Sequence, residues 1–262
     1  GSQFPVGTST VEFTATDQSG NTSVCSFTVS VTDTEVPVAI CQDLTVQLDN
    51  NGNGSTTAAA VDNGSSDACG IASLVLSQTA FVCSEVGANT EVLTVTDVNG
   101  NTSTCTTTIT VEDNVAPVAV CQNLTVQLDN TGQGSTTAAA VNNGSSDACG
   151  VADILLNKTV FNCSEVGSNI VTLTVTDVNG NESTCSATIT VQDNIVPVAV
   201  CQDVTIQLNN SGNASTTATA VDNGSSDACG IQSLSLSQTT FVCSEVGANT
   251  EVLTVTDVNG NT

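Results

Sequence analysis

The stretch LTVTDVNGNTSTCTTTITV, residues 93–111, decides the fold that this sequence predicts. It holds two runs in which apolar and polar side chains alternate, separated by the segment DVNGN. In the second run Cys105, Thr107, Ile109 and Val111 share one face and threonines share the other, which is the period of a β-strand. Asn and Gly in the middle segment accept the positive φ of a tight turn. The stretch therefore predicts a β-hairpin.

This stretch recurs along the chain with a period of 80 residues. The 12 cysteines fall into four series at that spacing, and three of the 4 prolines mark one repeated position. The period predicts a window on a longer array, cut within a repeat at both ends. Its four segments are the closing part of a repeat at 1–36, complete repeats at 37–116 and 117–196, and an incomplete repeat lacking its last strand at 197–262.

Each repeat is expected to consist of strands, because Thr, Val, Ile and Ser dominate and turn residues arrive about every 8–12 positions. Six or seven short strands in about 80 residues are typical of an immunoglobulin-like sandwich; a β-solenoid is the lesser option. The predicted fold class is all-β, with tandem immunoglobulin-like β-sandwich repeats of 80 residues, stapled by disulfides and arranged as an extended rod. One Phe per repeat is expected to anchor the core: Phe81, Phe161 and Phe241. In the first complete repeat the strands are predicted at 38–48, 55–61, 71–76, 79–83, 89–97 and 101–111, with no helix.

The charge of the chain excludes several classes of function. There are 26 acidic residues and one basic residue, Lys158, and the net charge is −25. Such a chain does not neutralise phosphates, so neither nucleic acid nor anionic lipid is an expected partner. It has no His, which removes most acid–base and nucleophilic catalysis, and no apolar run approaches the roughly 18 residues that span a membrane. The sequence predicts neither an enzyme nor membrane insertion, and its cysteines indicate an oxidising, extracellular setting.

Strand direction predicts the disulfides. If the first strand and the last strand of a repeat run parallel, Cys41 and Cys105 lie at similar heights on neighbouring strands. Cys69 and Cys83 flank an expected hairpin near residues 77–78, so they are predicted to face each other. Cys25 and Cys201 are expected to have partners outside this window. The predicted pairs are Cys41–Cys105, Cys69–Cys83, Cys121–Cys185, Cys149–Cys163 and Cys229–Cys243.

The segment FPVGTSTVEFTATDQSGNTSVCSFTVSVTD, residues 4–33, resembles the closing half of a hyalin repeat, the HYR module. The likeness rests on Phe-Pro-Val-Gly, then Thr-Asp-x-x-Gly-Asn, then a Cys followed by alternating apolar residues. The later repeats, with Ser-Glu-Val-Gly in place of the first motif, resemble the HYR-like arrays of giant cell-surface gliding adhesins of Bacteroidetes-type bacteria. This resemblance implies an immunoglobulin-like fold and an extracellular role in adhesion or in a filament.

Carboxylates are the remaining candidates for chemistry. The turn at 49–54 fits the first half of an EF-hand loop, but Ala60 stands where that loop needs Glu, so a plain hairpin turn is the better interpretation. The strand directions place acidic loops at the domain junctions, and the segment 112–117 resembles the calcium-binding linkers of cadherins. Clustered carboxylates without bases favour Ca²⁺, against the alternative that Asp and Asn only cap turns. The candidate ligands are Asp33, Glu35, Asp62, Asp67, Asp97, Asp113, Asn114, Asp147, Asp177, Asp193, Asn194, Asp222, Asp227 and Asp257.

These features predict a structural stalk section of a long secreted adhesin or filament on a bacterial cell surface. Its expected partners are further repeats of the same chain, and extracellular surfaces or glycans bound through other domains. Two alternatives stay open. The repeats could each bind a glycan or surface weakly and act together, or chains could associate laterally into a fibre through exposed strand edges.

Overall fold

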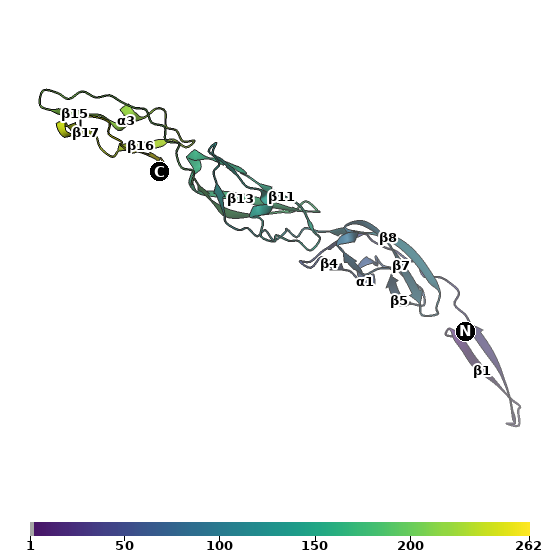
Figure 1. Ribbon diagram of the computed structural model, residues 1–262. Helices are drawn as coiled ribbons and strands as arrows, with labels where there is room; N and C mark the ends of the chain where they lie inside the picture. Colours follow the sequence, from purple (N-terminus) through teal and green to yellow (C-terminus); the bar gives the residue numbers. More distant parts are fainter. Residues whose placement is uncertain (1–2) are drawn as a thin grey trace. The chain divides into compact units, whose positions relative to one another are not determined.

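The computed structural model describes residues 3–262 and consists of β-strands joined by turns and very short helices (Figure 1). The chain divides into two compact units, Gly1–Val115 and Ala116–Thr262. The finer division into four segments stays a prediction from the period. Within residues 3–262 no helix has the length and apolarity to span a membrane.

The main sheet of the first complete repeat has the order β3-β8-β7-β5. Its members are β3 (Leu44–Gln47), β5 (Ile71–Leu76), β7 (Gly87–Asp97) and β8 (Thr102–Glu112). The strands β7 and β8 form the predicted antiparallel hairpin, and β3 pairs parallel to β8. Because the first and last strands run in the same direction, the chain enters and leaves a repeat at opposite ends. We call these ends the N-terminal and C-terminal poles.

A smaller layer faces this sheet and makes the repeat a sandwich. It contains the pair β4 (Asn53–Ser55) and β6 (Ala80–Val82) and the helix α1 (Ala58–Val61). A 3₁₀ turn, η1 (Cys83–Glu85), connects β6 to β7.

The same elements recur in the other segments. The N-terminal segment has the hairpin β1 (Gly7–Thr16) and β2 (Thr22–Val31). The second complete repeat contains β9 (Leu124–Gln127), β10 (Gln133–Ser135), α2 (Ala138–Val141), β11 (Val151–Leu156), β12 (Val160–Asn162), η2 (Cys163–Glu165), β13 (Gly167–Asp177) and β14 (Glu182–Gln192). The last segment contains β15 (Asn213–Ser215), α3 (Ala218–Val221), β16 (Ile231–Leu236), β17 (Thr240–Val242), η3 (Cys243–Glu245) and β18 (Leu253–Asp257).

Two strand predictions were wrong. The segment 55–61 is not a strand but continues into α1, a single helical turn whose first free N–H group is capped by the Thr57 hydroxyl. The segment 38–48 is mostly irregular, with isolated bridges at Val38 and Cys41 before β3. The expectation of no helix failed because one turn is too short to show a 3.6-residue period.

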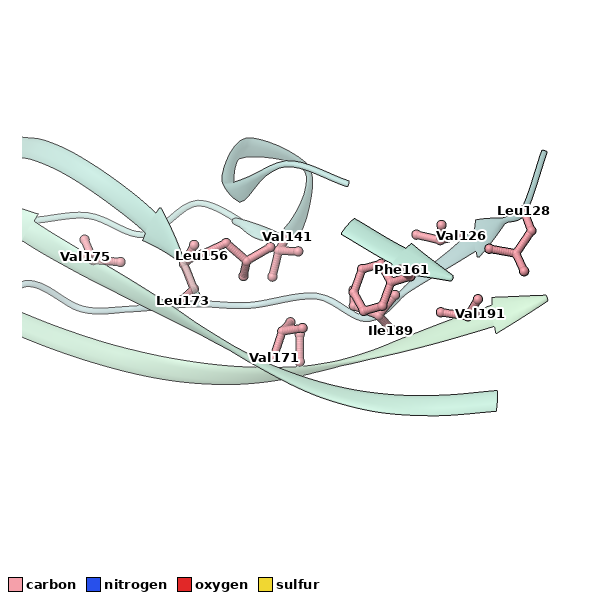
Figure 2. Packing of buried hydrophobic residues seen from close by; sticks show 11 residues of the cluster. Val126, Leu128, Val141, Leu156, Phe161, Val171, Leu173, Val175, Ile189 and Val191 are labelled. Atoms are coloured by element: carbon pink, nitrogen blue, oxygen red, sulfur yellow. The ribbon is translucent and has the colours of Figure 1, made fainter. Parts of the chain in front are cut away.

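The core of the second complete repeat lies between its two layers and is entirely apolar (Figure 2). Phe161 of β12 is 0% exposed and faces the large sheet, which confirms its expected role as core anchor. Alternate residues of β14 point inward, as the alternation predicts. The cluster consists of Val126, Leu128, Val141, Leu156, Phe161, Val171, Leu173, Val175, Ala187, Ile189 and Val191.

The strands β5 and β6 do not form the hairpin expected near residues 77–78. The strand β5 pairs with β7 in the large sheet, whereas β6 pairs with β4 in the small one. The chain from β5 to β6 therefore runs from one pole to the other. Cys69 precedes Gly70, whose carbonyl accepts from Val98 just beyond β7. Cys83 opens the turn that leads into the other end of β7, about 35 Å away along an 11-residue strand.

That separation overturns three predicted disulfides, because bonded cysteines need Cα atoms within about 7 Å. Cys163 instead bonds to Cys229 of the following segment, with the two Cα atoms 5.1 Å apart. The pairs Cys149–Cys163 and Cys229–Cys243 are thus wrong. The pair Cys69–Cys83 is wrong as well, since Cys69 is a free thiol while Cys83 is disulfide-bonded.

Two bonds form as strand direction predicts. Cys41 bonds to Cys105 and Cys121 to Cys185, with Cα separations of 5.9 and 5.8 Å. Each closes a separation of 64 residues, for which chain entropy predicts about 4 kcal/mol of stabilisation. The free thiols among the described residues are Cys25, Cys69, Cys201 and Cys243.

Substituting Phe161→Ala should lower the free energy of unfolding by about 3–5 kcal/mol, because it leaves a cavity between the two layers. The neighbouring Val160→Ala is the matched control: Val160 is 56% exposed on the same strand, and its loss should cost less than about 1 kcal/mol. Urea denaturation of both variants measures the difference. Equal losses would show that Phe161 is not the core anchor.

Candidate cation site at the N-terminal pole

The Thr-Asp-x-x-Gly-Asn motif builds the turn at the N-terminal pole. Oδ1 of Asp97 accepts the backbone N–H groups of Asn99 and Asn101 at 2.8 and 2.9 Å, and Oδ2 accepts the Asn101 side-chain amide at 2.7 Å. Gly100 has a φ of 94°, which a residue with a side chain rarely adopts. Each residue of the motif thus closes the turn.

Hydrogen bonding keeps the Asp97 carboxylate charged although its side chain is buried. Burial raises the pKa of Asp97, but the hydrogen bonds from the Asn101 side chain and from the backbone of Asn101 and Asn99 outweigh it, so the pKa lies below its usual value. The pKa of Asp257 is lowered by the corresponding bonds from Asn261 and Asn259.

The Asn of the motif also fixes the incoming linker. The Asn101 side chain donates to the carbonyl of Asp33 at 3.4 Å, and Asn261 donates to the carbonyl of Asp193 at 3.1 Å. The linker aspartate is consequently held at the pole of the repeat that follows it. Asp193 is only 7% exposed.

Two of the predicted ligand pairs come together at these poles. Near the start of the chain Asp33, Asp67 and Cys69 place one ligand atom each within 4.8 Å of one another. Asp193, Asp227 and Cys229 do the same in the second unit. We call these groups the first and the last pole cluster. Cys229 is disulfide-bonded, so only the carboxylates of the last pole cluster are candidate ligands.

The last pole cluster contains an unsatisfied acceptor. Oδ1 of Asp193 accepts the backbone N–H of Ile195 at 3.0 Å, whereas its Oδ2 is buried and has no hydrogen-bond partner. Oδ1 of Asp227 accepts the backbone N–H of Cys229 at 2.7 Å. In the turn above, Oδ1 of Asn259 is also buried without a partner. Buried oxygens in this state are costly unless a donor or a cation completes them.

No basic side chain of the described residues is free to neutralise these clusters. The only one, Lys158, forms an ion pair with Glu165 and lies over the Phe161 ring, 5.0 Å from its centre. In the first pole cluster a hydrogen bond to Asp33, burial and the nearby carboxylates raise the pKa of the Cys69 thiol. The thiol is thereby kept protonated. Oxygen-rich sites of this kind suit a hard cation such as Ca²⁺.

Other predicted ligands serve local structure. Asp62 and Asp222 accept the backbone N–H groups of Ser65 and Ser225 and so cap their own loops. The amides of Asn114 and Asn194 donate at 2.7 Å to glutamines of the preceding repeat, away from the following pole.

The remaining candidates have separate positions. The backbone N–H of Glu35 donates to Asp33, and the Glu35 carboxylate is not part of the first pole cluster. Asp177 caps its turn as Asp97 does, and Asp147 accepts the N–H of Cys149 at 2.7 Å. Oδ1 of Asp113 accepts the N–H of Val115 at 3.1 Å. An approach of Asp113 to Asp147 and Asp177 stays a prediction.

The EF-hand-like segment is a hairpin turn, as the sequence favoured. Oδ1 of Asp49 accepts the N–H groups of Asn51 and Asn53 at 2.8 and 3.0 Å, and the backbone closes the turn. Ala60 lies in α1.

Sequence analysis missed the double role of Asn101 and Asn261, which join the turn to the linker. The signal was present in the constant Asn that ends the motif, because a turn needs only the Asp and the Gly. It also missed that Cys229 borders the carboxylates, although its loop was placed at the correct pole.

Substituting Asn101→Ala should lower the melting temperature by roughly a few degrees, because it removes the donor to Asp97 and to the linker. The matched control is Asn99→Ala, whose exposed side chain makes none of these bonds. The lowered pKa of folded Asp97 contributes stability that is complete above about pH 3.9 and is lost as the pH falls through the folded pKa. Thermal melts from pH 7 to pH 2 should therefore show the difference between wild type and Asn101→Ala shrinking below about pH 4. A constant difference would contradict this role.

Comparison with known proteins gives one family and one curated relative. Residues 1–31 match the HYR domain family. Hyalin of Strongylocentrotus purpuratus is 34% identical over 213 residues, which is 77% of this chain and 18% of hyalin. The chain thus spans less than a fifth of the length of this relative.

Solved structures give only a loose likeness. Protocadherin gamma B2 extracellular cadherin domains 1–5 are 14% identical over 97% of this chain and 59% of that one, with a TM-score of 0.34. Drosophila N-cadherin EC1–4 is 11% identical over 72% of this chain and 59% of that one, also at 0.34. At such scores the likeness carries no argument. Together, the residue 1–31 match, the hyalin relative and the recurring turn motif show that the chain contains HYR-like domains.

Proposed function

We propose that this chain is a structural section of the stalk of a long extracellular adhesin or filament, displayed on a bacterial cell surface. The observation that carries the proposal is the burial of the linker residue Asp193 against the following segment, to which Asn261 ties its carbonyl. A flexible linker would leave such a residue in water. Its expected partners are further repeats of the same chain, and its role is mechanical rather than catalytic.

An extended arrangement follows from this proposal and is open to measurement. A compact 262-residue protein has a radius of gyration of about 18 Å. Each repeat is at least as long as its 11-residue strands, about 35 Å, so an end-to-end array should reach roughly twice the compact value. Small-angle X-ray scattering of the oxidised chain measures this radius. A value near 18 Å would refute the stalk.

We further propose that the carboxylates of the last pole cluster bind Ca²⁺ and stiffen the junction. The unsatisfied Oδ2 of Asp193, the nearby Asp227 and the absence of a free base among the described residues support this site. The protein would supply at least two carboxylate oxygens, and water would complete the coordination.

Ca²⁺ at ten times its dissociation constant should stabilise the folded state by about 1.4 kcal/mol per site. The melting temperature should therefore rise by several degrees in Ca²⁺ relative to EGTA. The double variant Asp193→Asn, Asp227→Asn should lose much of this response. The matched control Asp153→Asn, Asp203→Asn removes two exposed carboxylates outside the pole cluster and should keep it. Melting curves that do not respond to Ca²⁺ in the unsubstituted chain would eliminate the site.

A further inference from the structure

The disulfide between Cys163 and Cys229 has a different character from the other two bonds. The bonds Cys41–Cys105 and Cys121–Cys185 each close one repeat. Cys163 leads into β13 at the C-terminal pole of one repeat, whereas Cys229 lies in the loop at the N-terminal pole of the next. This bond therefore crosses the junction beside the linker.

The surroundings of Cys163 show a built contact. Gly132 has a φ of 73°, and a Cβ on it would stand 2.5 Å from the Cys163 sulfur and 3.5 Å from Cβ of Ala228. A turn of one repeat and the cysteine loop of the next thus approach so closely that only glycine fits. A groove lined by residues of both repeats borders this contact, among them Asn130, Asn194 and Ser226.

The local geometry of both cysteine positions recurs one repeat earlier. The sulfur of Cys83 lies 3.8 Å from the carbonyl oxygen of Gly52, as that of Cys163 lies 3.8 Å from the carbonyl oxygen of Gly132. The N–H of Cys149 donates to Asp147 at 2.7 Å, as that of Cys229 donates to Asp227 at 2.7 Å. Cys83 and Cys149 are both disulfide-bonded.

We propose that Cys83 bonds to Cys149 as Cys163 bonds to Cys229, so that successive junctions are crossed by the main chain and by a disulfide. Each bond forms when two thiols lose two protons and two electrons to an extracytoplasmic disulfide oxidant, which becomes a dithiol. The closed segments 41–105, 83–149, 121–185 and 163–229 then overlap in succession. No single backbone cut between Cys41 and Cys229 separates the chain.

The first junction provides an exception that the same rule explains. The bond Cys163–Cys229 spans 66 residues, and the residue 66 positions before Cys69 is Gln3. Gln3 therefore stands where the later repeats have Cys83, Cys163 and Cys243. Cys69 accordingly remains a free thiol. The junction near Asp33 is crossed by the main chain alone.

The composition of the chain allows a direct test with trypsin, since Lys158 is its only basic residue. Lys158→Gln removes the natural site and installs the residue present at the equivalent Gln78 and Gln238, both of which bond to a Glu as Lys158 does. Asn114→Lys or Thr34→Lys then creates one exposed cleavage site in the second or the first linker. Free thiols are blocked with N-ethylmaleimide, the protein is unfolded in urea and cleaved, and the fragments are separated without reductant.

We expect the chain cleaved after residue 114 to stay in one piece until dithiothreitol is added, and the chain cleaved after residue 34 to fall apart at once. Adding Cys83→Ser to the first variant should release its fragments without reductant. Release from Asn114→Lys alone would overturn the proposal, as the pairing Cys69–Cys83 would produce. Asn194→Lys serves as the positive control through the bond Cys163–Cys229.

A second measurement keeps the proposal testable if a variant fails to fold. Peptic mapping of the unsubstituted chain at acidic pH, where thiol exchange is slow, should give a mass for linked peptides containing Cys83 and Cys149. It should also give four alkylated cysteines, Cys25, Cys69, Cys201 and Cys243. A linked pair of Cys83 with any other cysteine would refute it, while an extended scattering profile in the same sample would leave the stalk intact.

Discussion

The parallel pairing of the first and last strands of a repeat is the constraint on which the other features depend. Leu44 pairs with Ile109 and Gln47 with Glu112, so the strand that follows the incoming linker and the strand that precedes the outgoing one point the same way. An antiparallel pairing would return the chain to the pole where it entered. With the parallel pairing, the loops at one pole face the preceding linker and those at the other face the next one. Junction chemistry is therefore built into the topology of each repeat.

The acidic residues have their main local role in backbone hydrogen bonding. Asp97 accepts three hydrogen bonds within its own turn, and Asp67 accepts the N–H of Cys69. Such bonds lower the pKa of Asp97 and keep its charge at neutral pH. A chain with one basic residue cannot offset these charges by ion pairs. Covalent bonds and a bound cation are the stabilising devices that remain compatible with this composition.

The alternation in residues 93–111 was sufficient to predict β7 and β8, because a strand with one buried face has a period that the sequence displays directly. The short helix α1 was not predictable in this way. The three alanines at 58–60 lie on one turn, and its cap, Thr57, looks like any other threonine of a Thr-rich strand. Local pattern therefore specified the long strands and left the short connections open.

The disulfides show where local reasoning fails for the site. The pairs Cys41–Cys105 and Cys121–Cys185 follow from strand direction, which the hairpin and the linker determine. Cys69 and Cys83 are near in sequence, and a hairpin between them was the simplest interpretation. The segment between them instead changes from the large sheet to the small one, a choice made by the burial of Leu76 and Phe81 in the core. Sheet membership is a tertiary property, so the sequence of residues 71–82 alone does not report it.

A disulfide across the junction stabilises a part of the molecule that the core cannot. Within the second complete repeat, 11 buried apolar residues and the bond Cys121–Cys185 already restrain the fold. A second bond inside the same repeat would close a segment that packing holds in place, and would add little. At the junction of the second unit, by contrast, the contacts are a polar loop, a glycine turn and a linker with little apolar surface to bury. Placing Cys163 and Cys229 at opposite poles uses the covalent bond where hydrophobic packing is weakest, and the price of that placement is a free Cys69 wherever the preceding segment has Gln instead of Cys.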